Sequence, residues 1–147
     1  MKKDNFYVGV QMVLFALYAF IPDILIINTT RPIRLFASIL VVIGLLIIAV
    51  SALQLNKNLS PFPSPKKNGK LITNGLYSII RHPIYLGLII LLFGYGLHSG
   101  SLSKLLNTIM LSVLFHYKAN YEEKLLVNVF SDYKIYQLTT FRIFPFI

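Results

Sequence analysis

The sequence predicts an all-α protein that crosses a membrane about four times and carries a further helix and a tail near its C-terminal end. Hydrophobic residues make up 56% of the 147 residues, and the mean hydropathy is +0.69. The apolar residues are gathered into long stretches of low charge, and lysines and arginines flank these stretches. These features are typical of a polytopic helical membrane protein, and the length suits a single domain over residues 1–147.

The composition also excludes several kinds of site. The chain has no cysteine, so it has no disulfide, no thiolate nucleophile and no Cys-ligated metal. Three scattered histidines and five acidic residues form no metal-binding pattern, and we expect no metal. A net charge of +9 would suggest nucleic acid as the partner of a water-soluble chain. Here the basic residues flank apolar segments, so we expect membrane lipids and no nucleic acid as partners, and nothing indicates an obligatory protein partner.

Residues 6–27 form the first predicted span. They are apolar except for Gln11 and Asp23, and Lys2 and Lys3 precede them. A signal peptide begins in the same way, but no small-residue cleavage site follows residues 21–23, so we expect the segment to be retained. A short outer connection over residues 28–34 then leads to the second span.

Residues 35–55 predict the second span with the clearest pattern. They are twenty-one residues without a charge, and at about 1.5 Å per residue a helix of that length crosses a bilayer core of about 30 Å. Residues 56–70 are different, because Pro61, Pro63 and Pro65 alternate among four lysines. They predict an extended surface loop in contact with lipid head groups.

The remaining apolar segments predict a helical hairpin. Pro83 suits the first turn of a helix, where its missing N–H is not needed, and residues 84–98 then form the third span. A turn of a few residues leads to the fourth, residues 102–117, which must run antiparallel to the third. Residues 116–130 continue the helical pattern, and we expect them to lie at the membrane interface.

The distribution of charge predicts the orientation. With the N-terminus in the cytosol, eleven of the fourteen lysines and arginines lie on the cytosolic side, and only Arg31, Arg34 and Lys104 lie outside. This positive-inside bias predicts a multi-pass protein with both the N- and the C-terminus cytosolic.

Arg81 and His82 stand directly before the helix that Pro83 begins. A helix N-terminus is already the positive end of the helix dipole, so two basic residues there indicate a site for a carboxylate or phosphate. The alternative is a basic pair that only fixes the membrane topology.

The surrounding motif resembles a known family. Within residues 74–87, Gly-Leu-Tyr is followed after three residues by Arg-His-Pro-Ile-Tyr-Leu-Gly. A second block over residues 121–145 holds paired glutamates, a Phe, two tyrosines three residues apart, and a late Arg and Pro. Both blocks, in this order, resemble integral membrane methyltransferases related to isoprenylcysteine carboxyl methyltransferase, which are also similar to phospholipid methyltransferases. The resemblance implies S-adenosyl-L-methionine as cofactor and a cofactor pocket that the C-terminal helix and tail complete.

The cofactor's chemistry suggests a role for each matched residue. Arg81, His82 and the helix start at Pro83 would bind the carboxylate, a glutamate would bind the ribose hydroxyls or the amino group, and tyrosines would surround the adenine. The resemblance thus implies a cofactor site of Tyr77, Arg81, His82, Pro83, Tyr85, Gly87, Glu122, Glu123, Tyr133 and Tyr136, with Glu123 and Arg142 as catalytic residues.

The two glutamates are adjacent on one helix and therefore point about 100° apart. Glu123 shares its face with His116 and Asn120, whereas Glu122 is four residues from Lys118, a spacing that favours an ion pair. We therefore expect Glu123 to face the pocket and Glu122 to face solvent beside Lys118.

The acceptor of the methyl group stays open. The apolar segments favour a lipophilic, membrane-resident acceptor, either an isoprenoid or prenylcysteine-like carboxylate or the amine or hydroxyl of another lipid. Leu76 and Phe141 replace prolines that are common in the family, and Arg142 is the only cation after the second tyrosine of the pair, so a carboxylate acceptor is not favoured. Two other functions are compatible with the sequence, namely a non-catalytic membrane scaffold and an NADPH-dependent membrane reductase.

Overall fold

The computed structural model describes residues 2–20, 22–23, 26–66 and 69–144, and within these ranges it is all-helical. The elements are α1 (Lys2–Phe20), α2 (Arg31–Leu55), the 3₁₀ helices η1 (Asn56–Asn58) and η2 (Gly75–Ser78), α3 (Pro83–Ser99), α4 (Leu102–Val129) and α5 (Tyr133–Thr139). Three of the predicted segments fall partly outside the described residues: the first span at 21 and 24–25, the proline-rich loop at 67–68, and the second sequence block at Pro145.

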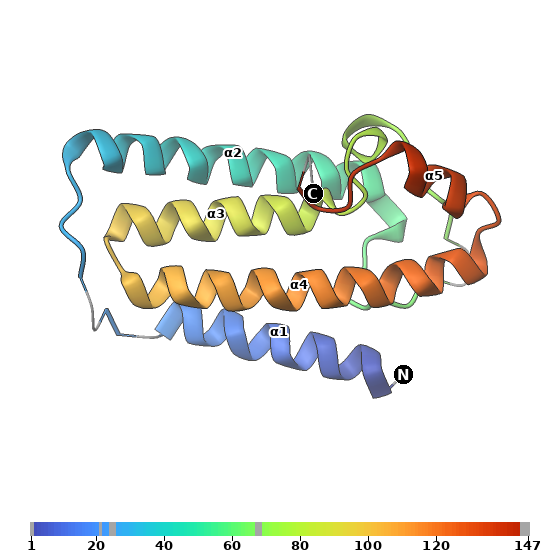
Figure 1. Ribbon diagram of the computed structural model, residues 1–147, viewed down its shortest axis with the longest axis horizontal. Coiled ribbons are helices and arrows are strands. Elements are labelled where there is room, and N and C mark those ends of the chain that lie inside the picture. Colours follow the sequence, from blue (N-terminus) through green and yellow to red (C-terminus); the bar gives the residue numbers. More distant parts are fainter. Residues whose placement is uncertain (1, 21, 24–25, 67–68, 145–147) are drawn as a thin grey trace.

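The four long helices lie side by side in one layer, in the order α2, α3, α4, α1 (Figure 1). Three elements gather at the same end of this layer, on the right of the view: the N-terminus, the loop that follows α2, and α5. A small core of Leu86 and Ile89 from α3 with Leu111 and Phe115 from α4 joins the two central helices, and Leu14 of α1 packs against it.

Glycines bring α2 and α3 unusually close together. A Cβ atom on Gly44 would lie 2.6 Å from the backbone nitrogen of Leu91, and one on Gly94 would lie 2.9 Å from the carbonyl oxygen of Ala37. Small residues of this kind let two helix backbones approach within van der Waals contact, which is how many helices associate in lipid.

The predicted end of the first helix is wrong. The prediction extended it to residue 27, but α1 ends at Phe20 and Pro22 follows in non-helical backbone. Proline has no N–H for a helical hydrogen bond, and its ring clashes with the preceding turn. Beyond it, Ile26 forms an isolated antiparallel bridge with Ser101, and the N–H of Ile27 donates to the carbonyl of Gly100 at 2.7 Å.

The other predicted helices form where expected, with small differences at their ends. α2 begins four residues before the predicted span, at Arg31, with Pro32 in its first turn. α3 begins at Pro83, as predicted, and ends at Ser99, where Gly100 caps it in the left-handed conformation with φ of 67°. The side chain of Ser101 then caps α4, which runs without a break to Val129. This confirms the helical continuation predicted for residues 116–130, except that Phe130 is extended.

One described helix is long and apolar enough to cross a membrane by length and composition, namely α2 with the turn after it, Arg31–Asn58. Its apolar side chains are largely exposed, including Leu35, Leu46 and Leu53. Exposed apolar surface of this extent is costly in water and marks a surface that contacts lipid or another protein. α3 is apolar but shorter, so the fourfold crossing stays a prediction.

Candidate active site

The C-terminal tail returns to pair with the segment that precedes α3. The N–H of Arg81 donates to the carbonyl of Phe141 at 2.8 Å, and that of His82 donates to the carbonyl of Arg142 at 3.0 Å. The N–H of Phe141 in turn donates to Ile79 at 2.9 Å, so a short parallel bridge joins the two segments. This pairing brings the two sequence blocks together.

Glu123 lies at the centre of the joined blocks. Its Oε1 accepts a hydrogen bond from Nε of Arg81 at 2.7 Å and lies 3.3 Å from Nε2 of His82. Its Oε2 accepts from the Gln137 amide at 3.0 Å and lies 3.1 Å from Nη2 of Arg142. The carboxylate is only 4% exposed, so a buried anion with cationic and amide partners connects α4, α5, the tail and the segment that precedes α3.

The pKa of Glu123 reflects this environment. Burial alone would raise the pKa of the carboxyl, but the hydrogen bonds and charges of His82 and Arg81 outweigh burial and lower it to about 2. Glu123 is therefore ionised throughout the physiological range.

The basic residues before α3 have their anion within the protein. Arg81 pairs with Glu123, and its Nη1 also donates to the carbonyls of Gln137 and Thr140. Because the N–H groups of Arg81 and His82 are taken by the tail, this helix start presents fewer free donors than its sequence suggested.

Glu122 takes a different position from the one expected. The hydroxyl of Tyr85 donates to its Oε2 at 2.8 Å, and Nδ1 of His82 lies 3.8 Å from the same oxygen. The prediction of an ion pair with Lys118 is wrong, because the Lys118 ammonium donates instead to Gln11 and to the carbonyl of Pro61. The rings of His82 and Tyr85 stack with an interplanar angle of 2°, which fixes the position of both groups that contact Glu122.

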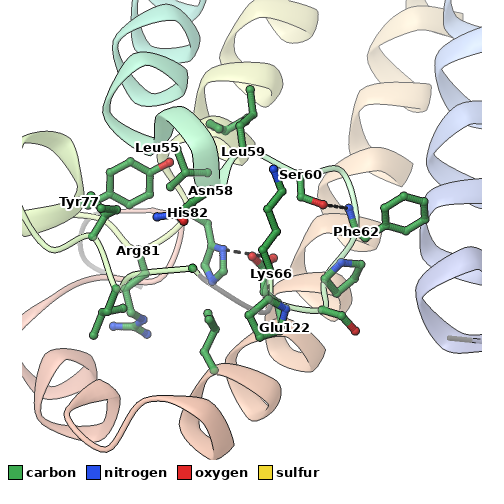
Figure 2. Close-up of a pocket in the computed structure, with 18 of the residues that line it drawn as sticks. Leu55, Asn58, Leu59, Ser60, Phe62, Lys66, Tyr77, Arg81, His82 and Glu122 are labelled. Atoms are coloured by element: carbon green, nitrogen blue, oxygen red, sulfur yellow. Dashed lines mark hydrogen bonds and ion pairs between the residues drawn. The ribbon is translucent and has the colours of Figure 1, made fainter.

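A cavity of about 370 Å³ opens beside Glu122. Figure 2 shows Arg81, His82 and Tyr77 on one side of it, with Glu122 near its floor and loop residues such as Ser60 and Lys66 opposite. Among the residues described for its lining, Glu122 is the single acidic side chain. Pockets of this size, mostly apolar with a few polar groups, are the usual form of a small-molecule site.

Three tyrosines form the wall of the cavity nearest α5. The ring of Tyr133 is almost completely buried and meets the ring of Tyr136 edge to face at 5.6 Å, while the Tyr136 hydroxyl donates to the carbonyl of Tyr77. Burial raises the pKa of Tyr136 to about 12 and also raises the pKa values of Tyr77 and Tyr133. All three therefore remain neutral and offer aromatic surface to a ligand.

The sequence matches the phospholipid methyltransferase family over residues 33–133, which is well over half of the chain. The chain belongs to this family. The match confirms the suspected resemblance to membrane methyltransferases, and it covers the first sequence block and both glutamates. No curated protein matches the sequence at a significant level.

Membership of the phospholipid methyltransferase family implies methyl transfer to lipid-like substrates by a membrane-associated protein. Against that background, the structure separates the predicted site residues into two groups. Those that line the cavity are Tyr77, Arg81, His82, Tyr85, Glu122, Tyr133 and Tyr136. Those that do not are Pro83, which begins α3, Gly87, which packs against Ile48 of α2, and Glu123 and Arg142, which pair with each other.

Two parts of the cavity of this phospholipid methyltransferase family member were not predicted from the sequence. The loop after α2 contributes residues 58–66 and 69–72, and we expected this loop only to contact lipid head groups. Gln11 of α1 and Lys118 of α4 also line the cavity, from distant parts of the sequence. The sequence signal for Lys118 was its position one helical turn before Glu122. That spacing instead suggested an ion pair on the protein surface.

Proposed function

We propose that the protein is an S-adenosyl-L-methionine-dependent methyltransferase that acts on a lipophilic acceptor within the membrane. The observation that carries the proposal is the cavity beside Glu122, where the two sequence blocks of a methyltransferase family meet. The proposed protein is a single domain that crosses the membrane about four times, with both termini and the cavity on the cytosolic side.

The residues around the cavity suit the groups of the proposed cofactor. Glu122 offers a carboxylate to ribose hydroxyls or to an amino group, and Tyr133 and Tyr136 offer an aromatic slot for adenine. Arg81 and His82 complete the wall, while Glu123 and Arg142 hold that wall in place from behind. We therefore assign cofactor contact to Glu122 and a positioning role to Glu123.

S-adenosyl-L-methionine supplies a methyl group on a sulfonium sulfur. The contribution of the protein is to hold the acceptor in line with that methyl group and to exclude water, which accounts for large accelerations without a nucleophile on the enzyme. The carboxylate of Glu122 and the rings of Tyr77 and Tyr85 would also favour a cationic group nearby.

The acceptor is proposed to enter sideways from the bilayer. The cavity reaches Gln11 of α1, and apolar loop residues such as Leu59 and Phe62 are exposed at its edge. An amine or hydroxyl of a lipid head group fits the family, and an isoprenoid or prenylcysteine-like carboxylate is the other class.

Isothermal titration of the detergent-purified protein with S-adenosylhomocysteine and, in parallel, with NADPH tests the proposal. Binding of S-adenosylhomocysteine without NADPH is expected. Binding of NADPH alone would identify a reductase, and binding of neither would favour a non-catalytic scaffold. Labelled methyl groups are then expected to appear in the total lipid extract of cells that make the protein.

A further inference from the structure

Lys118 is a buried cation in the cavity wall. The residue is 1% exposed, yet its side chain lines the 370 Å³ cavity. It lies on α4 one turn before Glu122, and its ammonium is near the ring of Tyr85 in the first turn of α3. A charge in such a position needs a compensating partner, because a buried ammonium without one is costly.

The partners that the structure gives Lys118 are polar but not anionic. Its Nζ donates to Oε1 of Gln11 at 2.6 Å and to the carbonyl oxygen of Pro61 at 2.8 Å, and it lies 5.4 Å from the centre of the Tyr85 ring. An ammonium has three N–H donors, so two hydrogen bonds leave one donor for another group.

The acidic residues of the chain are committed elsewhere. The sequence has five: Asp4, Asp23, Glu122, Glu123 and Asp132. Asp4 contacts Ser64, Asp23 pairs with Lys104, and Asp132 contacts Ser131. Glu122 contacts Tyr85 and His82, and Glu123 pairs with Arg81, His82 and Arg142. None of these carboxylates forms an ion pair with Lys118 in the described part of the chain, although Glu122 is near enough to influence it.

We propose that Lys118 is the anion-binding residue of the cavity, and that the bound ligand presents a carboxylate or phosphate to its ammonium group. Arg81 and His82 are already paired with Glu123, and the loop lysines Lys66 and Lys70 at the cavity are exposed to solvent. Among the cations described for the lining, Lys118 is therefore the buried one that lacks an anion. Burial lowers the pKa of the Lys118 ammonium and Glu122 opposes that decrease, and a bound anion would oppose it further.

The ligand anion has two sources under the proposed function. One is the carboxylate of the cofactor, and the other is an anionic group of the lipid acceptor, such as a phosphate. The inference rests on the proposed function for the first source, whereas the second requires only that the cavity binds a lipid anion.

Titration of the full-length protein in detergent with three probes distinguishes these sources. S-adenosylhomocysteine carries the carboxylate, 5′-methylthioadenosine has the same adenosyl group without it, and octyl phosphate represents a lipid anion, with octanol as its uncharged counterpart. The variants are Lys118→Met, which keeps the length without the charge, and Lys118→Arg, which keeps the charge. Lys124→Met is the matched control, because Lys124 lies on the same helix but is exposed.

Lys118→Met is expected to weaken binding of one anionic probe by about tenfold or more, as for the loss of a charge-assisted hydrogen bond, with Lys118→Arg retaining most of it. Loss for S-adenosylhomocysteine but not for 5′-methylthioadenosine identifies the cofactor carboxylate. Loss for octyl phosphate but not for S-adenosylhomocysteine identifies the acceptor.

The inference is overturned if the wild type binds neither anion, or if Lys118→Met binds both within twofold of the wild type. It is also overturned if the Met, Arg and Lys124 variants lose affinity equally, because the loss would then follow packing or overall charge. Thermal unfolding in detergent confirms that each variant is folded. If the wild type binds neither adenosyl probe, the proposed function fails, and the octyl phosphate series alone decides the role of Lys118.

Discussion

At the scale of single residues, two adjacent glutamates have separate tasks. Glu123 is buried among Arg81, His82 and Arg142 and is fully used by the protein, whereas the carboxyl of Glu122 is 25% exposed and borders the cavity. One side chain assembles the site, and the neighbouring one is free to meet a ligand.

Replacement of Glu123 by Gln is expected to destabilise the fold by about 3–5 kcal/mol, because the loss of one partner leaves the other buried charges unpaired. The free energy of unfolding can be measured by SDS titration in mixed micelles. Since the folded pKa is about 2 and the ordinary value is 4.5, the stabilisation is complete above about pH 4.5 and is lost as the pH falls through about 2. The difference between wild type and variant should therefore shrink over that range, and a constant difference would mean that the charge is not its cause.

Replacement of Glu122 by Gln is expected to weaken binding of S-adenosylhomocysteine about ten- to a hundredfold. The amide oxygen of Gln can still accept the Tyr85 hydroxyl, so stability should change by no more than about 1 kcal/mol. Asp132→Asn is the control, because this acid is exposed and bonded to the neighbouring Ser131. Unchanged binding by Glu122→Gln, with loss confined to Glu123→Gln, would return the cofactor contact to Glu123.

The sequence could predict that these residues meet but not how they divide their roles. Because both blocks resemble one family in the same order, the sequence predicted that Arg81, His82 and the two glutamates share one site. The rotation of α4 about its axis depends on packing, and neighbouring residues differ by about 100°. Lys118 was misassigned for the same reason, since its partners Gln11 and Pro61 are 107 and 57 residues away.

At the scale of elements, the contact between α2 and α3 depends on residues without side chains. Gly44→Ala is expected to destabilise the protein by about 1–3 kcal/mol, because the new methyl group would meet backbone atoms of α3 that cannot move aside. The effect can be measured by thermal or SDS unfolding.

The control for this substitution is Gly9→Ala in α1. Apart from the chain neighbours and the backbone of its own helix, no atom lies within 4 Å of a Cβ built at Gly9, so alanine should leave stability unchanged or raise it by up to about 1 kcal/mol. Equal effects at the two positions would show that helix propensity, and not close packing, governs both.

The helices were predictable to different degrees. The long uncharged run and the Pro83 start identified α2 and α3, because those signals are local. The end of α1 was missed although Pro22 marks it, since the apolar run continues beyond the helix and hydropathy alone does not distinguish helical from extended backbone. The pairing of the tail with the segment before α3 had no local signal.

At the scale of the whole molecule, the single layer leaves apolar side chains exposed on α1, α2 and α4, among them Phe20, Leu53 and Ile109. In lipid this surface is solvated, so a flat arrangement needs no second layer of helices. The layer thus supports the proposed membrane position, although α2 is the one described helix that is long and apolar enough by itself.

The proposed topology is tested with single cysteines, because the natural chain contains none. Cysteines at Asn5, Lys57 and Lys134, which are exposed at the cavity end, should resist an impermeant thiol reagent in intact cells. A cysteine at Thr30 should react, since it lies at the opposite end of α2. Reaction at Lys57 from outside would reverse the orientation and remove the cavity from the cytosol.

The helical hairpin has arms of unequal length, 17 residues in α3 and 28 in α4. Measured from the turn at Gly100, α3 rises only about 25 Å at 1.5 Å per residue, slightly less than the hydrocarbon thickness of about 30 Å. In the proposed orientation, His82 and Lys118 therefore lie at the boundary between acyl chains and head groups. The additional length of α4 places Glu122 just beyond this boundary. A lipid methylated at that depth keeps its tails among its neighbours. The enzyme then avoids the cost of extraction, about 0.8 kcal/mol for every CH₂ group drawn out of the bilayer.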